Sequence, residues 1–202
     1  KLVTIDGIVS GYIMEYIKSS NFKSILINED ILPKRKIELL KQVGVILRKM
    51  EALRKSGIIE DFYLNDLQEE NFVLDRDDAK LKVVDLDSIK IDDNKPFLSK
   101  YLSPFSPVRD FPTKYKRSEE NCTGSFIPDR NTDLYCYVMM IVNSILGIDA
   151  YRLTKGQYFR YMEFLVSVGV SKELVDILAK IYSLEENQYP DEYLDELIPY
   201  YD

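Results

Sequence analysis

Three side chains in the middle of the chain have the types and the spacing that phosphoryl transfer requires. Asp66 is followed five residues later by Asn71, and Asp85 follows the apolar run 81–84. If that run pairs with residues 72–74 as a hairpin, the strand ends bring Asn71 and Asp85 close enough to share a divalent cation that carries ATP phosphates. Asp66 would then face the attacking hydroxyl group.

The elements before this loop are predicted from turn signals and from apolar spacing. Residues 2–5 and 8–14 are expected to form two strands joined by an Asp-Gly turn of the hairpin type. A long amphipathic helix is predicted to begin at Pro33 and to end at Ser56 and Gly57. The apolar positions of this helix are Ile37, Leu40, Val43, Leu47, Met50 and Leu53.

The elements after the helix are shorter. Residues 58–63 are expected to form a strand that leads into the loop, and residues 88–130, with five Pro and little periodicity, a long functional loop. Thr132 and Asp133 are predicted to cap a buried apolar helix over residues 134–146, which Gly147 terminates. Further helical segments are predicted at residues 154–168, 171–182 and 190–200.

The composition limits the classes of protein and of site. The chain has 202 residues, 46% of them hydrophobic, which allows one sizeable core. Its formal net charge of −7 argues against a nucleic-acid partner. With no His and only Cys122 and Cys136, it lacks the usual zinc sites, a disulfide framework and Ser-His chemistry. No membrane-spanning stretch or signal peptide is recognisable, so we expect a soluble, cytoplasmic protein without a membrane partner.

This order of motifs resembles a protein kinase, of the bacterial or atypical Ser/Thr type. The resemblance covers residues 2–147 by motif and the remainder only by helix content. It implies an α+β fold, a mainly α-helical C-terminal lobe with short β-hairpins, preceded by the last strands of an N-terminal lobe. Residues 1–17 would end the N-terminal lobe and form the hinge. Residues 18–202 would form the C-terminal lobe, with residues 88–130 as an activation-segment-like loop.

The resemblance also implies roles for residues of the hinge, where the sequence is Gly-Tyr-Ile-Met-Glu-Tyr-Ile. Met14 would be the gatekeeper. The backbone of Glu15 and Ile17 would bind adenine, and Val73 would pack beneath the adenine ring. For a stretch of this kind, an ordinary buried edge strand remains the alternative.

For the catalytic loop, the resemblance implies that Asp66 is the base that accepts the substrate hydroxyl proton. Asn71 and Asp85 would bind Mg²⁺, the cation expected with ATP. Gln68 stands where many protein kinases have a Lys that contacts the transferred phosphate. Asp87 replaces the Gly of the Asp-Phe-Gly motif, and it would be either a second metal ligand or a solvated bystander. Without the resemblance, Asp66 and Asn71 would be ordinary turn formers.

Asp133 matches a kinase Asp that holds the backbone of the catalytic loop, although helix capping is its default role. Other parts of the pattern are missing. Leu64 and Asn65 replace the usual His-Arg, so no Arg is present there to bind a phosphorylated activation loop. The Gly-rich phosphate loop and the strand Lys would precede Leu2, and residue 1 is Lys rather than Met, so we expect an upstream N-lobe segment. A fragment without that lobe would be inactive.

Three functions follow from these observations. The first is an ATP- and Mg²⁺-dependent protein Ser/Thr kinase, favoured by the hinge-like segment and by the helix at Asp133. The second is a small-molecule kinase of the aminoglycoside or choline kinase type, favoured by Gln68 and by the missing His-Arg. The third is a pseudokinase or truncated kinase-like module that binds partners. Retention of Asp66, Asn71 and Asp85 argues against the third. The phosphoacceptor is therefore expected to be a protein or a small molecule.

Overall fold

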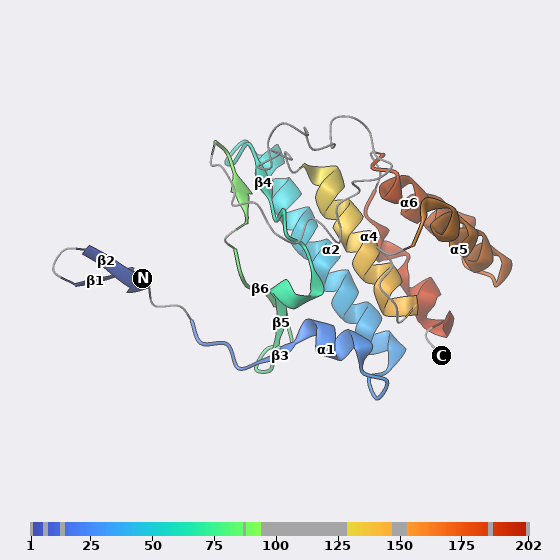
Figure 1. Cartoon of the computed structure of the whole chain (residues 1–202), viewed down its shortest axis with the longest axis horizontal. Helices are drawn as coiled ribbons and strands as arrows, with labels where there is room; N and C mark the ends of the chain where they lie inside the picture. Colours follow the sequence, from blue (N-terminus) through green and yellow to red (C-terminus); the bar gives the residue numbers. More distant parts are fainter. Residues whose placement is uncertain are drawn as a thin grey trace.

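The computed structural model describes residues 2–5, 8–12, 15–86, 88–93, 129–146, 153–185 and 188–200. Over these ranges the chain has a mostly helical α+β fold with small antiparallel sheets (Figure 1). The strands are β1 (Leu2–Ile5), β2 (Ile8–Tyr12), β3 (Ser19–Asn21), β4 (Phe62–Tyr63), β5 (Phe72–Asp75), β6 (Leu81–Val83) and β7 (Lys90–Ile91). The helices are α1 (Phe22–Ile27), α2 (Pro33–Lys55), α4 (Arg130–Leu146), α5 (Lys155–Ser167) and α6 (Lys172–Tyr182), with 3₁₀ segments at Glu69–Asn71, Pro190–Glu192 and Leu194–Tyr200.

Helices α2 and α4 lie side by side at the centre of the helical body (Figure 1). As predicted, α2 begins at Pro33 and ends before Ser56, where Gly57 adopts a left-handed φ of +72°. The predicted apolar positions of α2 are buried except Leu53, which is 36% exposed. The hydroxyl of Tyr137 in α4 donates to the carbonyl of Leu40 at 2.8 Å, so the two central helices are joined by a buried hydrogen bond as well as by apolar packing.

The predicted capping of α4 is confirmed in part for Thr132, whose Oγ1 accepts from the backbone N–H of Asp129 at 3.0 Å, and it is wrong for Asp133. The helix begins at Arg130, because the side chain of Asp129 serves as the cap. Its Oδ1 accepts from the backbone N–H groups of Asn131 at 2.9 Å and of Thr132 at 3.1 Å. Asp133 is therefore inside the first turn, and its carboxylate is available for contacts outside the helix. The predicted burial of α4 and its predicted last residue, Leu146, are confirmed, and Gly147 itself lies outside the described residues.

The C-terminal helices begin as predicted. Thr154 caps α5 through a capping box with Gln157, and Ser171 caps α6. The predicted helix at residues 190–200 is instead a pair of 3₁₀ segments. The second of them buries Leu194 and Leu197 completely and packs along α2.

The small sheets lie at one side of the central helices (Figure 1). β5 and β6 form the predicted hairpin, with Phe72 facing Val83. Strand β3, which the sequence analysis did not predict, adds to the free edge of β5. The predicted strand 58–63 is reduced to β4, which pairs with β7. β7 and the first residue of α4 both fall within the loop predicted for residues 88–130, of which residues 94–128 lie outside the described ranges.

The predicted N-terminal hairpin is present as β1 paired with β2, with Ile5 facing Ile8. Its turn and residues 13–14 lie outside the described residues. In Figure 1 this hairpin stands apart from the helical body. No helix in the described ranges has the length and apolar character needed to cross a membrane.

Candidate active site

The loop of residues 64–71, named the anchored loop from here on, is fixed to α4 by Asp133. This side chain is only 4% exposed. Its Oδ2 accepts from the backbone N–H of Leu64 at 2.9 Å, and its Oδ1 accepts from that of Asn65 at 3.1 Å. Burial raises the pKa of Asp133 to about 6, although these two hydrogen bonds and the charge of Arg54 act in the opposite direction. The loop-holding contact that the resemblance implies for Asp133 is thus present.

Asp66 lies at the centre of a small hydrogen-bonded network within the anchored loop. The Nδ2 of Asn71 donates to the backbone carbonyl of Asp66 at 2.8 Å and to its Oδ2 at 3.0 Å. The Nε2 of Gln68 donates to the same Oδ2 at 3.2 Å. Three of the predicted site residues are therefore brought together, and the orientation of the Asp66 carboxylate is set by two amide side chains.

The hairpin places Asp85 beside this network. The backbone N–H of Val84 donates to the carbonyl of Asn71 at 2.9 Å, so Asp85 immediately follows a residue that is bonded to the anchored loop. Asp85 is exposed and has a φ of +58°, a left-handed conformation that is uncommon for a residue other than Gly. Asn71 and Asp85 thus lie at the same end of the hairpin, as predicted, and the sharing of a cation by their side chains stays a prediction. Asp87 lies outside the described residues.

The donor atoms at this place suit Mg²⁺. Because Nδ2 of Asn71 faces Asp66, Oδ1 is the amide atom that is left to bind a cation. Together with the carboxylate of Asp85 it gives hard oxygen ligands, and Mg²⁺ usually takes one or two protein groups besides water and phosphate oxygens. No group of three or more His, Cys, Asp or Glu side chains that could hold a metal occurs among the described residues. The described residues therefore provide no carboxylate cage of the kind that binds a structural cation tightly.

The predicted adenine-binding residues lie near the same sheet. The Nζ of Lys82 lies 3.1 Å from Oε1 of Glu15. Lys82 lies on β6 and faces Val73 of β5, so this ion pair links the hinge-like segment to the β5–β6 hairpin. Val73 and Ile17 are half-buried and Glu15 is exposed, whereas Met14 lies outside the described residues.

Sequence reasoning missed the contribution of Asn65, which it treated only as a replacement for an Arg. Asn65 has a φ of +62° and is 4% exposed. Its Nδ2 donates to the backbone carbonyl of Ser88 at 3.0 Å. The one available signal was residue type, because Asn adopts the left-handed conformation more readily than most residues. The partner, 23 positions further along the chain, could not be inferred from it.

Comparison with known proteins finds no family model that matches the chain and no curated protein that matches it. Any functional assignment therefore depends on the geometry of the anchored loop and the hairpin, together with the resemblance of their motifs.

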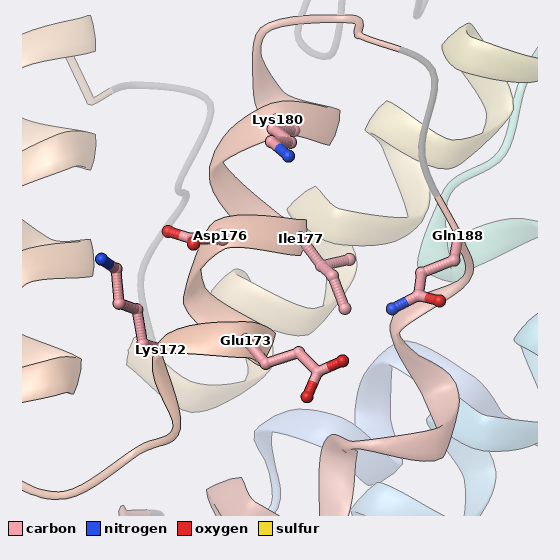
Figure 2. Close-up of a pocket in the computed structure, with 6 residues that line it drawn as sticks. All are labelled: Lys172, Glu173, Asp176, Ile177, Lys180 and Gln188. Carbon is pink, nitrogen blue, oxygen red and sulfur yellow. The ribbon is translucent and has the colours of Figure 1, made fainter.

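A surface depression of about 440 Å³ lies on α6, on the far side of α4 from the hairpin (Figures 1 and 2). Figure 2 shows Glu173 and Gln188 extending toward the same space. The hydroxyl of Tyr193 connects them, since it donates to Glu173 at 2.9 Å and accepts from Gln188 at 3.4 Å. Two Lys, one Glu and one Asp are the charged lining residues, so the depression carries no net formal charge. The lining residues are Lys172, Glu173, Asp176, Ile177, Lys180 and Gln188.

Proposed function

We propose that this chain is the catalytic lobe of a cytoplasmic, ATP- and Mg²⁺-dependent protein Ser/Thr kinase that belongs to a longer polypeptide. The observation that carries the proposal is the arrangement of three side chains. Asp66 and Asn71 share hydrogen bonds in one loop, and the hairpin places Asp85 next to Asn71. A base together with amide and carboxylate ligands for Mg²⁺ is part of the combination of groups that phosphoryl transfer to a hydroxyl uses.

In this proposal, Asp66 orients the substrate hydroxyl and accepts its proton. Its Oδ2 is engaged by Gln68 and Asn71, which limits rotation of the carboxylate and so holds Oδ1 in one direction. A base acts efficiently only when it is within hydrogen-bond reach of the proton that it removes. The two amide donors and the anchoring of the loop by Asp133 therefore serve orientation of the base.

Asn71 and Asp85 would hold Mg²⁺ in the same proposal. When bound, the cation would neutralise charge on the ATP phosphates and orient them. Glu15, Ile17 and Val73, with Met14 outside the described residues, would bind adenine. The ion pair between Lys82 and Glu15 supports this part by bringing the hinge-like segment near the sheet that would form the floor of the nucleotide site. It is an exposed contact, and Lys82 pairs more closely with Asp75, at 2.6 Å.

A small-molecule kinase is the second candidate, and the position of Gln68 favours it. Gln68 is 8% exposed and donates to Asp66, so it takes the place of the Lys expected in many protein kinases without supplying its charge. A small phosphoacceptor that brings its own cationic group would compensate for that missing charge.

The test uses the full-length polypeptide that carries this chain, incubated with labelled ATP, Mg²⁺ and either a generic protein substrate or a panel of small hydroxyl compounds. Asp66→Ala should abolish label transfer while ATP binding is retained, because the base does not contact the nucleotide. Asp85→Ala should instead weaken Mg²⁺-dependent ATP binding. Neither substitution should unfold the protein, since neither side chain is in the core.

Asp78→Ala is the matched control, because Asp78 is an exposed carboxylate at the opposite end of the same hairpin. It should transfer phosphoryl as the wild type does. Transfer to the small compounds alone would favour the second candidate. Nucleotide binding without any transfer would indicate a pseudokinase, and transfer that survives in Asp66→Ala would reject the assignment of the base.

A further inference from the structure

The segment that carries Asp85 is bonded to the anchored loop at two places, one on each side of Asp85. Before it, the N–H of Val84 donates to the carbonyl of Asn71 at 2.9 Å. After it, the carbonyl of Ser88 accepts from Nδ2 of Asn65 at 3.0 Å. The first bond continues the hairpin and involves only backbone atoms. The second depends on the side chain of Asn65, so a substitution of that residue would remove it.

Asn65 is itself held firmly. Its backbone N–H donates to Oδ1 of Asp133 at 3.1 Å, and its backbone adopts a left-handed φ of +62°. The carbonyl of Ser88 can only accept, so the amide nitrogen must be the end that faces it. The other end, Oδ1, is buried and has no hydrogen-bond partner within the described residues. The amide is thus oriented by the bond to Ser88 although this leaves a buried acceptor unsatisfied, which is normally avoided.

Asn65 also connects the two acidic groups of the proposed mechanism. It immediately precedes Asp66, and Ser88 lies three positions after Asp85. Rotation of the Asp85 segment away from the anchored loop would have to break this bond. Asp85 itself has a left-handed φ of +58°, a conformation that is uncommon for L residues although Asp adopts it more readily than most.

We propose that Asn65 is a positioning residue that ties the Asp85 segment to the anchored loop and so fixes the base relative to the cation ligand. The inference rests on the proposed function and adds its regulation to it. Where an Arg would bind a phosphorylated activation loop, this chain has a short side chain that donates a hydrogen bond to the carbonyl of Ser88. This bond involves no phosphorylated residue, so the proposal predicts that the tie forms without phosphorylation.

The experiment compares Asn65→Gly, Asn65→Asp and Ala79→Gly in the full-length protein. Gly keeps the left-handed backbone and removes the amide, while Asp keeps the size but lacks the donor. Ala79 is the matched control, because it has a φ of +56° at the exposed turn between β5 and β6. The two readouts are amide hydrogen exchange over residues 64–71 and 84–86, and phosphoryl transfer at varied Mg²⁺.

Both Asn65 variants should exchange faster in both segments, and Ala79→Gly should not. Their kcat should fall by roughly tenfold to a hundredfold, the order expected when reacting groups lose their alignment. The Mg²⁺ concentration for half-maximal rate should rise several-fold, which a general loss of folded protein would not produce. Unchanged exchange in both Asn65 variants would show that Asn65 does not hold the Asp85 segment to the anchored loop.

Faster exchange with kcat and Mg²⁺ dependence within about twofold of the wild type would overturn the positioning role. If the wild type itself transfers no phosphoryl group to any acceptor, the proposed function fails and the role in positioning fails with it. In that case the exchange measurement still decides whether Asn65 ties the two segments.

Discussion

Asp129 and Asp133 are four residues apart at the start of α4, and they stabilise different structures. Asp129 caps the helix, whereas Asp133 accepts two backbone hydrogen bonds from the anchored loop. We expect Asp129→Ala to lower the free energy of unfolding by about 1 kcal/mol, the usual value for a cap. Asp133→Ala should lower it by about 2 to 3 kcal/mol, because it leaves two buried N–H groups without an acceptor. Chemical denaturation at pH 8 measures both, well above the pKa of about 6 for Asp133.

Asp133→Asn provides the control for this comparison. Its side chain keeps one acceptor but directs an NH₂ group at the other backbone N–H, so its stability should lie between those of Asp133→Ala and the wild type. If Asp133→Ala costs no more than Asp129→Ala, the anchoring of the loop contributes little to stability.

At the residue scale, sequence could predict only those neighbours that a hairpin brings together. Asn71 and Asp85 flank two short apolar strands, so pairing of the strands is sufficient to place them. The role of Asp133 as a cap was wrong because Asp129 also fits that role, and propensity does not choose between two acidic residues four positions apart. The bond between Asn65 and Ser88 depends on backbone dihedral angles that residue types favour but do not determine.

At the scale of elements, α2 approaches the first C-terminal 3₁₀ segment so closely that a side chain would not fit. A Cβ added at Gly44 would lie 2.7 Å from both Cβ and Cγ of Asp191. Gly44→Ala should therefore force the two elements apart and lower the free energy of unfolding by about 1 to 3 kcal/mol, as overpacking typically does. Thermal or chemical unfolding would measure the loss.

Gly156→Ala is the matched control, because Gly156 is also helical and a Cβ there would meet no atom within 4 Å. Its expected effect has the opposite sign, a gain of about 0.5 to 1 kcal/mol from helix propensity. Equal effects of the two substitutions would mean that the approach of Asp191 to Gly44 is not tight in solution.

Elements with strong local signals were predicted well, and those that depend on distant partners were not. Pro33 and Gly57 mark the ends of α2, and Thr154 and Ser171 mark the beginnings of α5 and α6. Strand β3 has only three residues, Ser-Ser-Asn, and none is a strong strand former. It exists because β5, more than 50 positions later, offers an open edge, as Ser19 facing Asp75 shows.

At the scale of the whole molecule, the C-terminal residues close the helical body through contacts with α2. The guanidinium of Arg48 pairs with the carboxylate of Asp191 and with that of Glu192, the latter at 2.9 Å, and lies 5.4 Å from the ring centre of Tyr189. Asp191 is only 5% exposed, so it depends on this partner for its charge. The acidic C-terminal stretch is thus used within the fold.

Arg48→Gln should therefore destabilise the molecule and release its C-terminal segment. We expect a loss of about 2 to 3 kcal/mol, below the usual range for a broken buried pair because Arg48 is itself partly exposed. Amide exchange should increase over residues 190–200. Lys49→Gln, one position further along the same helix and exposed, should change stability by no more than about 0.5 kcal/mol. If the proposed function holds, phosphoryl transfer per folded molecule should be unchanged in both variants, because neither substitution touches the anchored loop.

The double variant Gly44→Ala with Arg48→Gln tests whether Asp191 is the residue through which α2 holds the C-terminal segment. Both substitutions affect contacts of Asp191, so their effects on the free energy of unfolding should not be additive. Once the Cβ at position 44 has displaced Asp191, the charge pair has already been weakened, and its removal should cost less. The combined loss in free energy of unfolding should therefore be smaller than the sum of the single losses by at least about 0.5 kcal/mol. Additive losses would show that Arg48 stabilises the C-terminal segment through Glu192 and Tyr189 instead.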